Sequence, residues 1–246
     1  MIALLEIIIK ATQQQMTDPG IYYPSHLSGA QLDLFLEKGW YRMGQGIFTT
    51  NYIVQDDVVC RVFWLRYILN EVTLGKKSKQ ILSNNQQFNV AVLPVCITAE
   101  HEALYTLYKS GLDFDPAANV TEWLYEQQAN NVFDTYMIEV RDGEKLIALG
   151  IFDKGLNSIA GIMNFYHPDY KKYSLGKYLM LLKMEYAKSN HIHWYYPGYI
   201  VYGYPKFDYK LFADKTAAQL FFPELNKWCL YDPVMASKMA QPQENI

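Results

Sequence analysis

Residues 135–196 decide the fold, and they read TYMIEVRDGEKLIALGIFDKGLNSIAGIMNFYHPDYKKYSLGKYLMLLKMEYAKSNHIHWYY. Two apolar runs, Thr135–Arg141 and Lys145–Phe152, flank the pair Asp142-Gly143. This pair favours a tight hairpin, because both central positions of such a turn need positive φ. After a further turn, Ser158–Tyr166 has the composition of a strand. The pattern therefore predicts three consecutive antiparallel strands.

A helix and another strand are expected to follow. Ser174 is a residue type that caps helix N-termini, and apolar side chains recur at helical spacing from there to about Asn190. A strand is expected at Ile192–Tyr196. The order of three antiparallel strands, a helix and a strand resembles the core of the GNAT acyltransferase fold. We therefore predict an α+β protein, with a GNAT-like mixed, mostly antiparallel sheet flanked by helices.

The first hundred residues are richer in strand signals. Ile47–Val54 and Val58–Leu69 are apolar runs that we expect to pair, and Phe88–Cys96 is expected to form another strand. Residues 17–30 have the composition of a loop, and Met1–Ile9 is expected to be a strand or a short helix. Short helices are expected over Gln31–Lys38, Thr98–Ser110 and Val120–Gln128.

The 246 residues are enough for one large domain or two modest ones. We place a boundary near residue 97, where strand signals give way to helices. This predicts a β-rich N-terminal α+β domain, residues 1–97, and a C-terminal GNAT-like acyltransferase domain, residues 98–246. Since 50% of the residues are hydrophobic and 19% charged, disorder over most of the chain is excluded. The net charge of −3 restricts any nucleic-acid contact to a local basic face.

Membrane, disulfide and metal classes find no support in the sequence. No apolar run reaches the ~18 residues that a membrane span needs, and no basic residues precede the apolar N-terminus as in an export signal. We expect a cytoplasmic protein with no membrane partner. Cys60, Cys96 and Cys229 are odd in number and far apart, so they form neither a disulfide framework nor a CxxC metal signature. We expect reduced thiols, no metal and no cofactor.

The segment Lys171–Tyr178 lies where a strand is expected to lead into the helix. The first N–H groups of a helix have no partner within it, and the helix dipole favours anions there. Gly176 would let a ligand approach the backbone, and the nearby lysines add positive charge. The segment therefore predicts a site for an acyl donor that carries phosphate. The alternative is an ordinary capped helix with solvated lysines.

A second segment, Trp194–Lys210, contains six tyrosines and two lysines in seventeen residues. Tyrosines offer faces on which bases stack and hydroxyls that form hydrogen bonds. The lysines could hold a phosphate or a carboxylate. The alternative is an aromatic sheet edge or a surface for a protein partner.

Together these segments resemble the signature of the aminoacyl-tRNA–protein transferases, the arginyl and leucyl transferases that extend protein N-termini. The family writes R-S-L-G-x-Y where this chain has Tyr173–Tyr178, and Y-Y-x-G-x-x-I-x-x-C-P-K-M-x-Y-K, with variation, over Tyr195–Lys210. The family's leading Arg, its Cys and its Met are replaced here by Tyr173, Tyr204 and Phe207.

The resemblance covers residues 133–212 well and the N-terminal half loosely. There Gly39-Trp40-Tyr41-Arg42 and the strand that contains Arg66 resemble the family's first domain. That domain usually has a cysteine cluster, whereas Cys60 stands alone here, and one thiol cannot build a metal or iron–sulfur site. Lys76, Lys77 and Lys79 either replace the family's basic segment or form a solvated loop.

The resemblance implies transfer of arginine or leucine from a charged tRNA to the N-terminal α-amine of proteins that begin with acidic residues. It implies donor contacts from Lys172, Ser174, Leu175, Gly176, Tyr178 and Gly198. Arg66, Lys206 and Lys210 are candidates to bind the acidic acceptor. Tyr199 or Tyr209 is expected to assist proton transfer, and Glu185 is a weaker base candidate.

Two other functions stay open on the sequence. One is a GNAT-type N-acyltransferase that uses acyl-CoA, although the usual Q/R-x-x-G-x-G/A loop for the CoA pyrophosphate is incomplete around Gly176. The other is a binder of tRNA or acidic N-termini that does not catalyse transfer.

Overall fold

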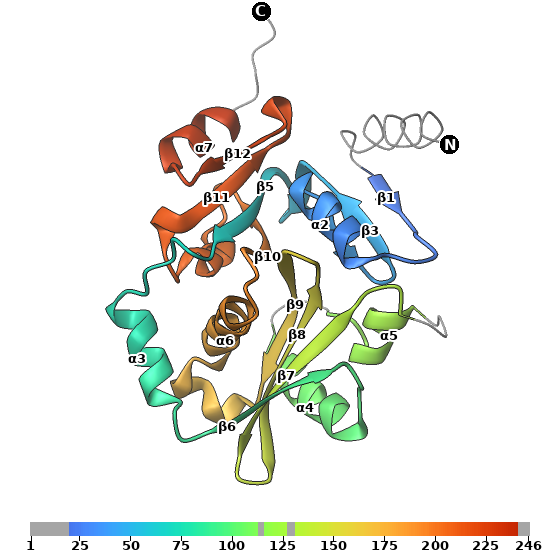
Figure 1. The fold of residues 1–246 in the computed structure, drawn as a ribbon, viewed down its shortest axis with the longest axis vertical. Helices are drawn as coiled ribbons and strands as arrows, with labels where there is room; N and C mark the ends of the chain where they lie inside the picture. The colour runs from blue at the N-terminus through green and yellow to red at the C-terminus, as the bar shows by residue number, and fades with distance from the viewer. Residues whose placement is uncertain (1–19, 113–115, 127–130, 241–246) are drawn as a thin grey trace, which may run out of the picture.

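The computed structural model describes residues 20–112, 116–126 and 131–240. Within them, nine strands form one mixed sheet and three form a second, smaller sheet (Figure 1). In spatial order the large sheet consists of β12 (Lys227–Leu230), β11 (Ala218–Phe222), β5 (Val58–Ile68), β10 (Trp194–Val201), β9 (Ser158–Tyr166), β8 (Lys145–Lys154), β7 (Thr135–Asp142) and β6 (Asn89–Pro94), and β4 (Tyr52–Gln55) pairs with β5. The small sheet consists of β1 (Gly20–Tyr22), β3 (Gly46–Thr49) and β2 (Tyr41–Met43).

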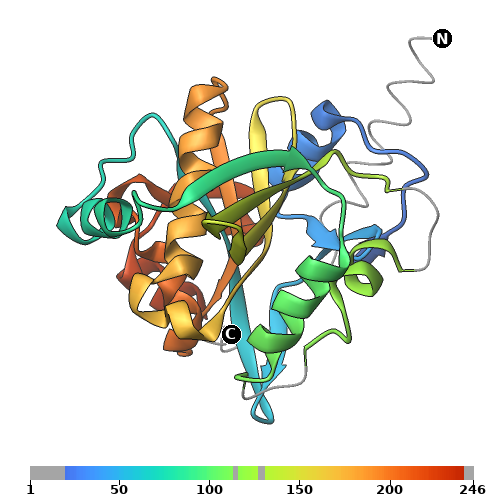
Figure 2. The same cartoon turned by 90° about the horizontal axis from the view of Figure 1, so that it is seen from below.

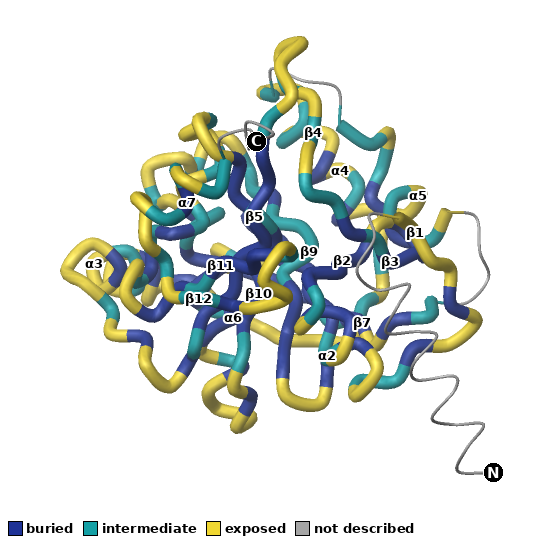
Figure 3. Tube along the Cα trace, turned by 90° about the horizontal axis from the view of Figure 1, so that it is seen from above, coloured by how far each residue is buried: buried dark blue, intermediate teal, exposed yellow. Residues whose placement is uncertain are grey.

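Helices cover both faces of the large sheet (Figure 2). On one face α6 (Leu175–Ser189) packs against β8, β9 and β10, and α3 (Lys76–Asn84) lies beside it. On the other face α4 (Ala99–Lys109) packs against β8 and β9 and contacts α5 (Val120–Tyr125). A separate cluster of buried apolar side chains joins α2 (Gly29–Glu37) and the small sheet to β5, β10 and β12. Figure 3 shows β5 buried along most of its length, with exposed loops around it.

The structure confirms the α+β class and the predicted core order. β7, β8 and β9 form consecutive antiparallel pairs, α6 follows, and β10 pairs in parallel with β9. The hairpin turn lies between Asp142 and Lys145, with Gly143 at a φ of 58°. The expected strand over Phe88–Cys96 appears as β6, and the three expected short helices appear as α2, α4 and α5. The element expected at Met1–Ile9 lies outside the described residues.

The prediction of a single strand over Ile47–Val54 is wrong. It divides into β3 and β4, because the Thr50 hydroxyl donates to Tyr52 O at 2.6 Å and turns the chain between them. Only β4 pairs with β5 as expected. The segment read as a loop contains β1.

Three further local features differ from the sequence predictions. Lys76, Lys77 and Lys79 lie on helix α3 rather than in a loop. Ser174 precedes α6, but its side chain makes no capping hydrogen bond. Its N–H closes the preceding 3₁₀ turn η1 (Pro168–Tyr173) onto Lys171 O, which leaves Ser174 at a φ of 54° instead of the extended conformation of a capping residue. The elements β11, β12 and α7 (Pro233–Ala240) were not predicted.

Strands from both sides of residue 97 share the large sheet. β5 pairs with β10 and β11, and β6 pairs with β7. The division into residues 1–97 and 98–246 stays a prediction about folding units. No helix in the described part of the chain is long and apolar enough to cross a membrane.

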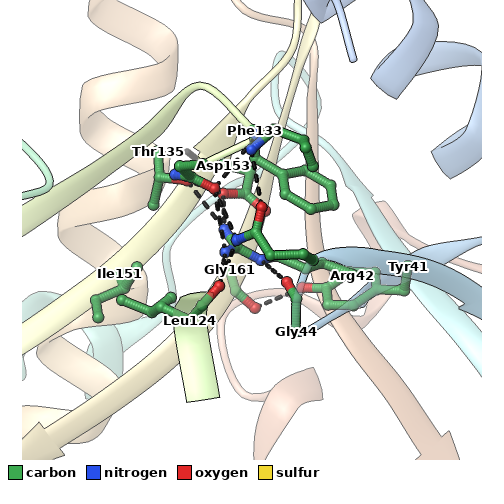
Figure 4. Close-up of polar contacts among 12 residues, drawn as sticks. Tyr41, Arg42, Gly44, Leu124, Phe133, Thr135, Ile151, Asp153 and Gly161 are labelled. Atoms are coloured by element: carbon green, nitrogen blue, oxygen red, sulfur yellow. Dashed lines mark hydrogen bonds and ion pairs between the residues drawn. The ribbon is translucent and has the colours of Figure 1, made fainter. Parts of the chain in front are cut away.

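A buried ion pair fixes the small sheet to the large one (Figure 4). Arg42 Nη1 of β2 lies 2.8 Å from Asp153 Oδ1 of β8, and both side chains are fully buried. The five N–H donors of Arg42 all have acceptors: Gly44 O, Thr135 Oγ1, Asp153 Oδ1, Leu124 O and Asn131 Oδ1. Burial raises the pKa of Asp153, but the guanidinium cannot lose its proton, so the carboxylate balances a permanent buried charge.

We expect Asp153→Asn to lower the free energy of unfolding by about 3–5 kcal/mol, because it leaves the Arg42 charge buried without a counter-charge. Urea unfolding monitored by tryptophan fluorescence measures this. The control is Glu100→Gln, which removes a half-exposed partner of Arg141 and should cost less than about 1 kcal/mol. Equal losses in the two variants would contradict the central role of the Arg42–Asp153 pair.

Candidate active site

A pocket opens where β9 and β10 separate. The two strands pair only through Ser158–Ala160 and Trp194–Tyr196. Beyond these pairs, a cavity of about 350 Å³ lies between residues 161–164 of β9 and 197–199 of β10. Its volume falls at the lower end of the range for small-molecule sites. The divergence of two parallel neighbours therefore provides the space for a ligand within the sheet.

One wall of the pocket is a β-bulge in β10. Tyr195 pairs with Tyr67 and Gly198 with Leu65, so β10 has one residue more than β5 over this stretch. Gly198 adopts a φ of 101°, which L side chains rarely adopt. From the opposite side the Tyr41 hydroxyl contacts Gly161 O and lies 2.9 Å from Tyr196 O, so it links β9 and β10 where they part.

Lys210 supplies positive charge at the bulge. It belongs to the 3₁₀ segment η2 (Pro205–Leu211), and its Nζ donates to Tyr199 O at 2.7 Å. The ammonium lies 4.9 Å from the Tyr199 ring and 5.1 Å from the Phe207 ring. Burial lowers the pKa of Lys210 to about 8, while the rings favour the charged form. Arg42 also lines the pocket, but Asp153 balances its charge.

Aromatic side chains cover much of the remaining surface. Burial raises the pKa of Tyr199 and of Tyr209, so both phenols stay protonated near neutral pH and act as hydrogen-bond donors rather than as bases. Trp64 of β5 is 4% exposed and stacks on Tyr41 with ring centroids 5.3 Å apart. Its indole Nε1 is buried without a hydrogen-bond partner. An unpaired buried donor at the pocket wall is a group that a ligand oxygen can satisfy.

The pocket brings together four of the residues predicted from the sequence: Gly198, Tyr199, Tyr209 and Lys210. Arg66 lies elsewhere, with its guanidinium 3.9 Å from the Trp194 ring and its Nε bonded to Gln219. Lys206 is exposed on η2, and Glu185 is exposed on α6. Neither lines the pocket.

Apart from Gly198, the predicted donor residues lie in the first turn of α6 or just before it, outside the pocket lining. Leu175 and Tyr178 are buried in the core, so their side chains hold the helix rather than face solvent. Lys172 and Ser174 are exposed and Gly176 is half-buried. The same helix reaches the pocket through Met180.

Several pocket residues were not proposed as site residues from the sequence. Tyr41 and Arg42 were noticed only as part of a family-like segment, and Trp64, Asn164 and Met180 were not singled out. Their strands are distant along the chain, so no local spacing connects them. Among the described residues, no three His, Cys, Asp or Glu side chains gather into a metal-binding group.

The amino-acid sequence is similar to those of known transferases. The family described as "Arginine-tRNA-protein transferase, C terminus" matches residues 100–216. An aspartate/glutamate leucyltransferase of Leptospira interrogans is 25% identical over 214 residues, which cover 83% of this chain and 79% of that protein. The chain is therefore similar to aminoacyl-tRNA–protein transferases over most of its length. The description of that family names a transferase that acts on a tRNA and a protein.

A second sequence relative and a solved structure are also similar to this chain. An aspartate/glutamate leucyltransferase of Shewanella sp. (strain MR-7) is 33% identical over 152 residues, which cover 59% of this chain and 62% of that protein. Among solved structures, a tandem GNAT protein from the clavulanic acid biosynthesis pathway is similar with a TM-score of 0.42 and 13% identity, covering 78% of this chain and 57% of that chain. The residues matched to the transferase family include β9, β10 and η2, whereas Arg42 and Trp64 lie before them.

We expect Gly198→Ala to lower the free energy of unfolding by about 1–2 kcal/mol, because an L side chain is strained at this positive φ. Urea unfolding measures the loss. Gly176→Ala is the control: its new Cβ would meet the Tyr166 ring at an ordinary 3.5 Å, and alanine favours the helix. A Gly198→Ala protein as stable as the control would show that the bulge relaxes without strain.

Proposed function

We propose that this chain transfers leucine from leucyl-tRNA to the α-amine of proteins that begin with aspartate or glutamate. The observation that carries the proposal is the ammonium of Lys210, held among aromatic rings at the bulge that forms one wall of the pocket. This ammonium attracts the carboxylate of an acidic first residue. It repels the guanidinium of an arginyl donor, which favours leucine over arginine.

The proposed reaction requires little from the protein beyond positioning of the two substrates. The α-amine of the acceptor attacks the ester carbonyl of leucyl-tRNA, a peptide bond forms, and the tRNA leaves with its terminal ribose hydroxyl restored. The ester is already activated, so the protein's tasks are to orient the reactants and to stabilise the oxyanion. A free α-amine has a pKa of about 7.7–8.0, so a reactive fraction is present near neutral pH without a strong base.

In this proposal different residues contact the tRNA and the reacting ester. Lys172, Ser174 and Gly176 at the start of α6 would meet the phosphates near the tRNA 3′ end, with Leu175 and Tyr178 holding the helix in place. The backbone at Gly198 would face the oxyanion. The protonated Tyr199 or Tyr209 hydroxyl would donate to the leaving ribose oxygen. Charged tRNA is found in the cytoplasm, and the proposal places the chain there.

The same experiment separates this function from its rivals. Purified protein is incubated with an Asp-initiated peptide and leucyl-tRNA, arginyl-tRNA or acetyl-CoA in separate tubes, and products are weighed by mass spectrometry. The proposal expects addition of leucine alone. Addition of arginine would overturn the donor assignment, and acetylation would assign the chain to the CoA enzymes. Binding of tRNA and peptide without a product would identify a non-catalytic binder.

We expect Lys210→Gln to lower kcat/KM for an Asp-initiated peptide by roughly 10- to 100-fold, the loss of a hydrogen bond to a charged group. The control Lys227→Gln, at an exposed position of β12 outside the pocket lining, should stay within about threefold of the wild type.

The pH profile gives an independent check on Lys210. In the wild type, kcat/KM should rise as the peptide amine loses its proton and fall as pH passes about 8, where Lys210 loses its charge. The falling limb should vanish in Lys210→Gln and with peptides whose first residue is neutral. A falling limb that survives in both would remove Lys210 from the acceptor site.

A further inference from the structure

A fully buried lysine lies behind the pocket, and the proposed reaction does not use it. Lys183 of α6 has no exposed surface. Its Nζ donates to Ile151 O at 2.7 Å, to Met163 O at 3.2 Å and to Asn164 Oδ1 at 2.8 Å. An ammonium carries three N–H donors, and three oxygens accept them here. Burial lowers the pKa of Lys183 to about 7, but hydrogen bonds to three oxygens favour its charged form.

This lysine lies at an irregularity in the strand that forms the pocket wall. Ile151 pairs with Met163, but the next residue, Phe152, pairs with Gly161, so the β8–β9 register shifts there. The ammonium bonds the carbonyls of Ile151 and Met163, the pair at the edge of the shift. Lys183 therefore ties together two strands where their ladder is interrupted.

The same ammonium determines which way the Asn164 amide faces. Two hydrogens of Nζ go to backbone carbonyls and the third to Asn164, so the amide atom facing Lys183 is the oxygen. The space around that oxygen is tight, because a Cβ added at Gly150 would lie 3.0 Å from it. The Nδ2 group must then face away from Lys183. It donates to Gly176 O at 3.5 Å, a long hydrogen bond that occupies one of its two hydrogens and leaves the other for a ligand.

Asn164 lines the pocket, so the second hydrogen of its amide is within reach of a ligand there. Under the proposed function, four groups of the substrates meet there: an amine, a carboxylate, a leucine side chain and the ester. The carboxylate is assigned to Lys210, which approaches from η2 rather than from β9. The leucine side chain has no acceptor, and the attacking amine must keep its lone pair free. The ester oxygens lie at the reacting centre, and each can accept a further hydrogen bond from an amide beside the one already assigned to it.

We propose that Asn164 binds an oxygen of the aminoacyl ester through its Nδ2–H, and that Lys183 is the positioning residue that fixes this orientation. The inference rests on the proposed function and deepens it by assigning a donor-binding residue. Asn164 also connects the pocket to Gly176 at the start of α6, where the tRNA end is expected.

The substitution Asn164→Asp separates binding from structure. The carboxylate keeps an acceptor for Lys183 and gains charge attraction to it, so the unfolding temperature should stay unchanged or rise. The second oxygen replaces the N–H donor and faces the ester oxygen. We expect kcat/KM for leucyl-tRNA to fall by about 10- to 100-fold, while KM for the peptide stays the same. Asn164→Ala removes the donor without adding charge but also removes an acceptor of Lys183, so its kcat/KM should fall by about tenfold and its unfolding temperature should fall as well.

Control measurements distinguish a failure of the Asn164 assignment from a failure of the proposed leucine transfer. Asn190→Asp makes the same change at an exposed position where α6 ends, and it should keep kcat/KM within about twofold, which excludes a general repulsion of tRNA. If Asn164→Asp transfers leucine as fast as the wild type with an unchanged unfolding temperature, Asn164 is only a partner of Lys183 and the inference is wrong. If the wild type itself transfers no leucine, the proposed function fails, and the assignment of Asn164 fails with it.

Discussion

The buried pair of Arg42 and Asp153 is the interaction on which the site depends. It joins β2 of the small sheet to β8 of the large sheet with all five guanidinium donors bonded. Because a charge left without its partner in the core is costly, the small sheet has one position on the large one. That position puts Tyr41, the neighbour of Arg42, against the carbonyls of Gly161 and Tyr196 and completes the pocket. A charge pair at the edge of the pocket thus shapes the space in which substrates meet.

Two interruptions of the sheet create the pocket itself. The bulge at Gly198 turns β10 away from β9, and the register shift beside Met163 alters the facing wall. Each interruption disturbs the pairing of backbone groups, and in each case a lysine bonds a carbonyl nearby. The half-buried Lys210 donates to Tyr199 O, and the buried Lys183 donates to Ile151 O and Met163 O. Regular strands would have closed the sheet, whereas these strands leave a cavity that Lys210 lines and that Lys183 adjoins through Asn164.

The departures from the family signature have structural explanations. The Tyr204 hydroxyl donates to Asp56 at 2.6 Å and so joins the η2 region to the tip of the β4–β5 hairpin. Phe207 stacks on Tyr199 and forms part of the cage around Lys210. Tyr173 packs edge-on against Phe88, and its carbonyl accepts from Asn85. The side chains that stand in place of the family's residues therefore support the pocket and the start of α6.

The sequence by itself determined the elements whose signals are local. Asp142-Gly143 predicts the hairpin, the apolar spacing predicts α6, and the order of elements predicts the GNAT-like core. Gly198, Tyr199, Tyr209 and Lys210 lie within one short segment, so their proximity was also readable. Only the tertiary structure decided that Arg42, Trp64 and Asn164 join them, and that Arg66 does not, because pairing between distant strands fixes those positions. Ser174 shows the limit of local rules, since the turn before it fixes a backbone that its side chain cannot cap.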